Sequence, residues 1–123
     1  MSREVSRSRL LDLTEQTAFD QREIVGEALR NWAAGSVSVA PGDRDELLRS
    51  YAIRRFALEK NGIDQGGLDA VLDRLRAYPR KEVWGFAIHD DERTIIGFLD
   101  DELSEIVALL VLPRNFEALA NKW

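Results

Sequence analysis

The chain has 123 residues, enough for one domain with its own core, and its 45% hydrophobic and 32% charged residues are typical of a folded globular protein. It contains no cysteine, which excludes disulfide bonds, zinc–thiolate sites and cysteine nucleophiles. The formal net charge is −5, and no apolar run approaches the roughly 18 residues that cross a bilayer, so we expect no membrane partner.

The first third of the chain predicts one clear helix. Residues 1–19 have poor periodicity, and we leave open whether they form an extra helical turn or two or a mobile arm. A helix is predicted over 19–35, with Asp20 as its N-cap, Glu23 completing a capping box and Gly35 ending it. Its apolar residues recur at helical spacing: Ile24, Val25, Ala28, Leu29 and Trp32.

Two further helices are predicted in the middle of the chain. Residues 36–42, closed by Pro-Gly, read as a linker in which Val37 and Val39 could form a short strand. Asp43 and Glu46 form a capping box for a helix over 43–62. Its expected apolar arc holds Leu47, Leu48, Tyr51, Ala52, Phe56 and Leu58, and Ile53 lies outside this arc. A third helix is predicted over 64–80, capped by Asp64 and stopped by Pro79.

The last third predicts a small sheet. Residues 82–89 and 94–100 read as two strands joined by a four-residue turn, with His89 opposite Thr94 and Trp84 opposite Leu99. Residues 105–112 form a third strand or a buried helix, and we favour the strand. Both faces of these strands are apolar, so helices or another subunit should cover both. A short helix is predicted over 114–123.

Together, these elements predict a single α+β domain over 1–123. It has three helices packed on a small antiparallel sheet of two or three strands, followed by a short C-terminal helix.

The negative charge gathers in the last third of the sequence. Residues 82–123 hold nine acidic and three basic residues, and the candidate binding residues there are Asp90, Asp91, Glu92, Asp100, Asp101 and Glu102. Such a segment suits a basic protein partner and argues against binding nucleic acid, whose phosphates need clustered positive charge.

Arg55 and Trp123 are two further candidate binding residues. Arg55 falls inside the apolar arc of its helix, so it must extend to solvent, pair with an acid such as Asp100 or Glu102, or bind a ligand. Trp123, near the chain end, either packs on the core or contacts a partner.

No residue pattern predicts a catalytic or metal site. Asp90–Glu92 and Asp100–Glu102 lie at opposite ends of a strand, roughly 20 Å apart, so they cannot share one metal ion. Asp69 and Asp73 are four residues apart on a helix with Arg76 beside them, which favours a surface row of ion pairs. We therefore expect no cofactor and no bound metal.

The sequence thus favours a small acidic protein-binding module, such as an adaptor, a chaperone or an inhibitor of the immunity type, which acts through its acidic last third on a basic protein. A homodimer is also compatible with strands that are apolar on both faces. The cysteine-free sequence suits a reducing compartment, so we expect the cytoplasm. The alternative is a small-molecule or metal-binding protein, or a weak hydrolase, with a pocket near His89, Asp91 and Arg55.

Overall fold

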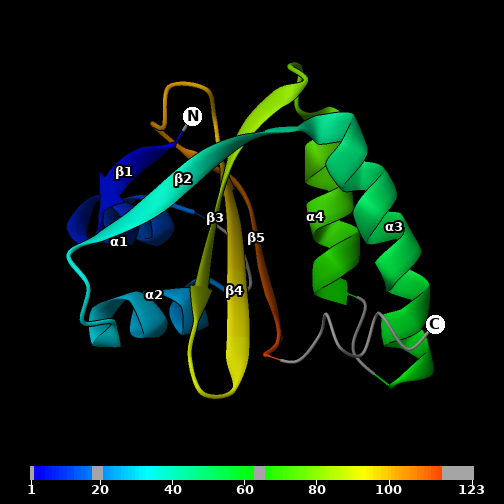
Figure 1. Ribbon diagram of the computed structural model, residues 1–123, viewed down its shortest axis with the longest axis horizontal. Helices are drawn as coiled ribbons and strands as arrows, with labels where there is room; N and C mark the ends of the chain where they lie inside the picture. Colours follow the sequence, from blue (N-terminus) through cyan, green and yellow to red (C-terminus); the bar gives the residue numbers. More distant parts are fainter. Residues whose placement is uncertain (1, 18–20, 63–65, 115–123) are drawn as a thin grey trace.

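The computed structural model describes residues 2–17, 21–62 and 66–114, which adopt an α+β architecture (Figure 1). These residues form five strands and four helices, so the predicted two or three strands and three helices were too few. In chain order the elements are β1 (Arg3–Ser6), α1 (Arg7–Glu15), α2 (Arg22–Asn31), β2 (Ser36–Asp43), α3 (Arg44–Lys60), α4 (Gly66–Ala77), β3 (Glu82–His89), β4 (Arg93–Leu99) and β5 (Ile106–Pro113). The helix predicted over 114–123 lies outside the described residues, apart from Arg114, and so does Trp123.

The strands form one antiparallel sheet whose spatial order follows the chain. Helices α1 and α2 lie between β1 and β2 in sequence, and α3 and α4 lie between β2 and β3. Figure 1 shows the first pair of helices on one face of the sheet and the second pair on the other. Each pair covers its own apolar cluster, so the predicted covering of both sheet faces is confirmed, and this chain supplies both covers.

The three C-terminal strands follow the sequence prediction closely. Trp84 lies opposite Leu99 and His89 opposite Thr94, as the four-residue turn requires. Residues 106–113 form a strand and not a helix, and it pairs with β4 along its length. Side chains alternate between the two clusters, with Phe86 in the one under α1 and α2 and Phe98 in the one under α3 and α4.

The N-terminal part of the sheet was predicted only in part: the short strand considered at Val37 and Val39 is present, but as part of a longer strand, and β1 was not predicted. The expected linker over 36–42 is instead the eight-residue strand β2, whose first half pairs with β1 and whose second half pairs with β3. Val37 and Val39 are buried between exposed or half-buried neighbours, the alternation of a strand with one covered face. Within 1–19, where a helical turn or a mobile arm was left open, Arg3–Glu15 form β1 and α1.

The helix ends agree only in part with the predicted caps. Asp43 caps α3, because its carboxylate accepts hydrogen bonds from the amides of Asp45 (2.9 Å) and Glu46 (3.0 Å). Helix α2 ends at Asn31, with Trp32 already extended, so the predicted stop at Gly35 was wrong. The predicted caps Asp20 and Asp64 lie outside the described residues.

Among the described residues, helix α3 is covered on one side only. It packs on α4, which itself packs on β5, and it reaches the sheet through Tyr51, whose ring meets that of Phe98 edge-on at 6.2 Å. Leu58 is buried, but Phe56 is 59% exposed, which contradicts its predicted place in the buried arc. The two side chains are about 200° apart around the helix, so they cannot both face α4.

Candidate functional site

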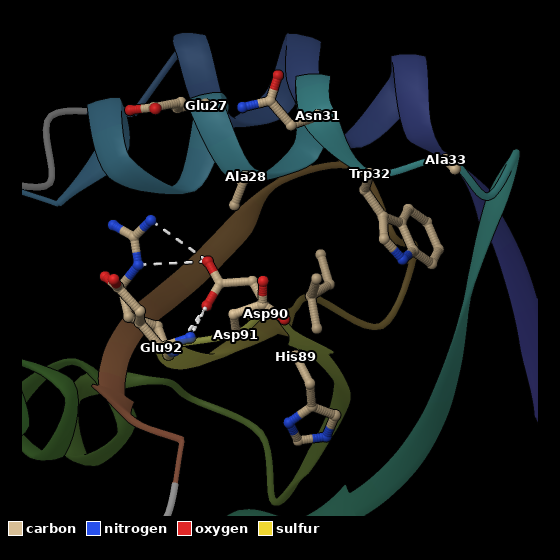
Figure 2. Close-up of a pocket in the computed structure, with 11 residues that line it drawn as sticks. Glu27, Ala28, Asn31, Trp32, Ala33, His89, Asp90, Asp91 and Glu92 are labelled. Carbon is tan, nitrogen blue, oxygen red and sulfur yellow. Dashed lines mark hydrogen bonds and ion pairs between the residues drawn. The ribbon is translucent and has the colours of Figure 1, made fainter.

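The candidate site is a groove between α2 and the turn of the β3–β4 hairpin, which we call the α2–hairpin groove (Figure 2). It has a volume of about 500 Å³. One wall comes from α2 and the residues after it, and the other from the hairpin. The lining residues are Glu27, Ala28, Asn31, Trp32, Ala33, Ile88, His89, Asp90, Asp91, Glu92 and Arg93.

Trp32 supplies the aromatic surface of this groove. The backbone leaves the helical conformation at Trp32 (φ −76°, ψ 125°), and the Trp32 carbonyl accepts a hydrogen bond from the Arg7 guanidinium. The side chain is half-buried and packs against the cluster that includes Ile88. An indole held in this way offers a fixed apolar face at little further cost in conformational entropy.

Asp90 organises the hairpin turn. Its Oδ1 accepts hydrogen bonds from the amides of Glu92 (2.9 Å) and Arg93 (2.6 Å), and its Oδ2 accepts one from Arg93 Nε (3.3 Å). The dashed lines in Figure 2 mark interactions of this carboxylate. The hydrogen bond from the Glu92 amide, followed by the Arg93 amide and charge, lowers the pKa of Asp90 against the opposing effect of desolvation. This carboxylate is therefore committed to the turn.

The remaining carboxylates of the groove are less engaged. Glu27 and Glu92 are exposed, and within the described part of the chain neither forms a side-chain hydrogen bond or an ion pair. Asp91 is fully exposed, and its nearest cation is the Arg114 guanidinium at 3.9 Å, a distance at which an exposed pair is weak. The rim of the groove is therefore negative, because Arg93, the one cation among the described residues that line it, is held by Asp90.

His89 does not direct its ring into this negative rim. Its Nδ1 lies 3.0 Å from Thr94 Oγ1, the residue opposite it on β4, and Figure 2 shows the imidazole pointing away from α2 and Trp32. Across the described residues no group of three histidine, aspartate or glutamate side chains is placed to hold a metal ion. The structure thus does not bring His89 and Asp91 into one cluster of ligands.

The second acidic group, Asp100–Glu102, lies at the other end of β4. The Asp100 carboxylate accepts hydrogen bonds from the amide (2.6 Å) and hydroxyl (2.7 Å) of Ser104 and shapes the β4–β5 turn. Asp101 forms an ion pair with Arg80, and its amide donates to the Tyr78 hydroxyl at 3.3 Å. Of these three acids only Glu102 is exposed, and the candidate residues Asp90–Glu92 and Asp100–Glu102 form two separate clusters at opposite ends of β4, not one continuous face.

Arg55 has a partner that the sequence did not predict. Its Nε donates a hydrogen bond to Asp69 Oδ1 on α4 at 2.8 Å, and this hydrogen bond raises the pKa of the guanidinium. Arg55 therefore pairs with neither Asp100 nor Glu102, and it does not line the groove. Of the predicted surface row of ion pairs on α4, only the pair of Asp73 with Arg76 (3.2 Å) is present, because Asp69 pairs with Arg55 on the preceding helix α3.

Sequence reasoning missed the α2 wall of this groove. Trp32 was placed among the apolar residues of its helix, and Glu27 and Asn31 were not considered. The sequence signal for this wall is Trp32 at the end of its helix, with the acid Glu27 five residues earlier. This signal identifies no site until the hairpin is known to lie opposite.

Comparison with known proteins found no matching family model, and neither a curated protein nor a solved structure with significant similarity. In the described part of the chain, no helix is long and apolar enough to cross a membrane.

Proposed function

We propose that the protein binds a basic segment of another protein in the α2–hairpin groove. One observation carries this proposal: the carboxylates of Glu27, Asp91 and Glu92 line the same groove as the half-buried indole of Trp32, and none has an ion-pair partner closer than 3.9 Å among the described residues. This combination of aromatic surface and free negative charge suits a lysine or arginine side chain.

Each part of such a side chain would have a matching contact. Its aliphatic stem can lie on the Trp32 ring, and its cationic head can extend along the groove toward the carboxylates that line it. An arginine would gain charge-assisted hydrogen bonds from Glu27 or Glu92. A groove of about 500 Å³ accommodates a few side chains of a partner, not a whole domain.

The rival reading, a small-molecule or metal-binding protein or a weak hydrolase near His89, has less support. Sites for small molecules are mainly apolar with a few polar groups, whereas this groove carries four carboxylates. The His89 imidazole points away from Trp32, and Arg55 is engaged with Asp69 on α4.

The biological role that fits this binding mode is an adaptor, a chaperone or an inhibitor of the immunity type for a basic protein in the cytoplasm. Asp100, Asp101 and Glu102 would add to the attraction at long range, because a negative surface raises the rate at which a positive partner arrives. Asp90 would contribute indirectly, by holding Asp91 and Glu92 in the turn.

The experiment is a calorimetric titration with a lysine- and arginine-rich peptide, comparing wild type with Trp32→Leu and with the double variant Glu27→Gln/Glu92→Gln. We expect each variant to weaken binding by about tenfold or more, which corresponds to the loss of about 1.4 kcal/mol. Glu102→Gln/Glu105→Gln is the matched control, because it also removes two exposed acids, at the opposite end of β4.

Two results would contradict the proposal. If Glu102→Gln/Glu105→Gln weakened binding as much as Glu27→Gln/Glu92→Gln, the attraction would be a property of net charge and not of this site. If Trp32→Leu left the affinity unchanged, the indole would have no part in binding. A titration repeated at high salt should retain part of the affinity, since the aromatic contact is screened less than exposed charges are.

A further inference from the structure

The outward side of α3 carries an apolar patch that nothing described in the structure covers. Among the described residues three large hydrophobic side chains are exposed, and Ile53 and Phe56, at 75% and 59%, are the two most exposed. They are three residues apart on one helix and therefore adjacent on its surface. Such side chains are normal when scattered singly, but a pair on one helix face marks a contact surface.

This patch is the centre of a longer pattern, which we call the α3 seam. It consists of Glu46, Arg49, Ile53, Phe56 and Lys60, all of them exposed. Their spacing of three, four, three and four residues is that of a coiled-coil seam, and at 100° per residue they fall within an arc of about 80°. The buried residues Tyr51 and Leu58 lie on the opposite side of the helix, against α4 and the sheet.

We infer that the occupant of the α3 seam is a second copy of this chain, packed antiparallel about a two-fold axis near Ile53. The charges along the seam support this occupant, since the acid Glu46 lies at one end of the seam and the base Lys60 lies at the other. A parallel pair would place each charged residue beside its own copy, and like charges repel. An antiparallel pair instead brings opposite ends of the seam together.

The antiparallel arrangement is self-complementary, as a two-fold interface must be. Glu46 lies seven residues before Ile53 and Lys60 lies seven after it, about 10 Å in each direction along the helix. The axis therefore sets Glu46 beside the partner's Lys60. It also sets Arg49 level with the partner's Phe56, a ring that already attracts its own Lys60, whose Nζ lies 4.7 Å from the ring centre.

The size of the seam fixes the strength of this dimer. Helix α3 has 17 residues and is about 25 Å long, so a contact about 10 Å wide covers roughly 250 Å² per copy. Stable interfaces bury about 800 Å² per partner, so the dimer should be weak and should form only at high concentration. Helices α3 and α2 lie on opposite faces of the sheet, so a dimer through α3 leaves the α2–hairpin groove of each copy open. The inference therefore does not depend on the proposed function.

Sedimentation equilibrium tests the inference directly on the full chain. Between about 10 μM and about 1 mM we expect the average mass to rise from 14.0 kDa toward twice that value, as micromolar to millimolar affinity requires. Ile53→Glu and Phe56→Glu should each abolish the rise, while circular dichroism stays that of the wild type. A chain that stays monomeric over the whole range would overturn the inference, and so would a dimer that survives both substitutions.

A charge exchange then tests the antiparallel orientation. Glu46→Lys and Lys60→Glu should each weaken the dimer by several-fold, and the double variant, which restores opposite charges across the axis, should recover most of the loss. Glu59→Lys is the matched control, because Glu59 is exposed on the same helix about 100° away from Lys60. A double variant no better than the single ones would refute the arrangement.

Discussion

Phe86 on β3 lies directly opposite Gly97 on β4, and its ring fills the space that a side chain at residue 97 would need. The neighbouring register pair has the reverse order, with Gly85 on β3 opposite Phe98 on β4. The two rings lie on opposite faces of the sheet, Phe86 toward α1 and α2 and Phe98 toward α3 and α4. Gly97 thus makes room for the Phe86 ring, and this cross-strand pairing helps to fix the register.

The two glycines should respond differently to an added methyl group. A Cβ at residue 97 would overlap the Phe86 ring, whereas a Cβ at residue 85 would meet the Phe98 ring at 3.6 Å, an ordinary contact. We expect Gly97→Ala to lower the free energy of unfolding by about 1–3 kcal/mol, the usual cost of overpacking a core. Gly85→Ala is the control and should change it by less, as measured by urea unfolding. Equal losses would contradict this difference.

The pKa of Asp90 predicts how the hairpin turn contributes to stability at low pH. Hydrogen bonds from the Glu92 and Arg93 amides lower this pKa below 3.8, so the folded state holds the charged form more tightly than the unfolded chain does. The contribution is therefore fully present above the unfolded pKa and is lost as the pH falls through the lower folded value. Asp90→Asn should melt at a lower temperature than the wild type at pH 6, and the difference should shrink below about pH 4.

Thermal melts of both proteins between pH 6 and pH 2 provide the measurement. Asp43 also has a lowered pKa, mainly because the Glu46 amide donates to it, so both proteins lose some stability in the same range. The difference between the melting temperatures of the wild type and Asp90→Asn at each pH therefore reports the contribution of Asp90 alone. A difference that stays constant down to pH 2 would mean that the charge of Asp90 does not stabilise the turn.

Helix α3 gives a direct comparison of a buried and an exposed apolar residue. Leu58 is 1% exposed and packs under α4, whereas Phe56 is 59% exposed. We expect Leu58→Ala to cost about 2–5 kcal/mol of stability and Phe56→Ala less than about 1 kcal/mol. The protein must be dilute, so that self-association adds nothing. Chemical denaturation measures both, and a large loss for Phe56→Ala would place that ring in the core after all.

The sequence predicted the C-terminal strands well because their signals are local. A four-residue turn between two apolar runs determines the register, which the pairing of Trp84 with Leu99 confirms. The cap of α3 by Asp43 was also predictable, since it involves amides only two and three residues away. Signals of this kind need no knowledge of the tertiary structure.

The prediction failed where the structure depends on distant contacts. Strand β1 has four residues, too few for a periodic pattern, and β2 was hidden by Pro41 and Gly42 although Val37 and Val39 already alternate with serines. Of the α2–hairpin groove, the sequence indicated only the hairpin wall, through His89, Asp91 and Glu92. The α2 wall could not be predicted, because Trp32 and Glu92 are sixty residues apart and line one groove only when the sheet is assembled.

Arg55 illustrates the same limit and offers a test of the corrected pairing. The residue lies at a position where sequence periodicity suggested an apolar arc, and its partner Asp69 comes from a helix whose placement the pattern did not give. Both side chains are nearly half exposed, so we expect a small favourable coupling between them that weakens as salt is added.

A double-mutant cycle with Arg55→Gln and Asp69→Asn measures this coupling as a difference in unfolding free energy. The parallel cycle with Arg55→Gln and Glu102→Gln should give no coupling, since Glu102 lies in the β4–β5 turn and is not an ion-pair partner of Arg55. Coupling to Glu102 instead of Asp69 would mean that α3 and α4 do not pack as described.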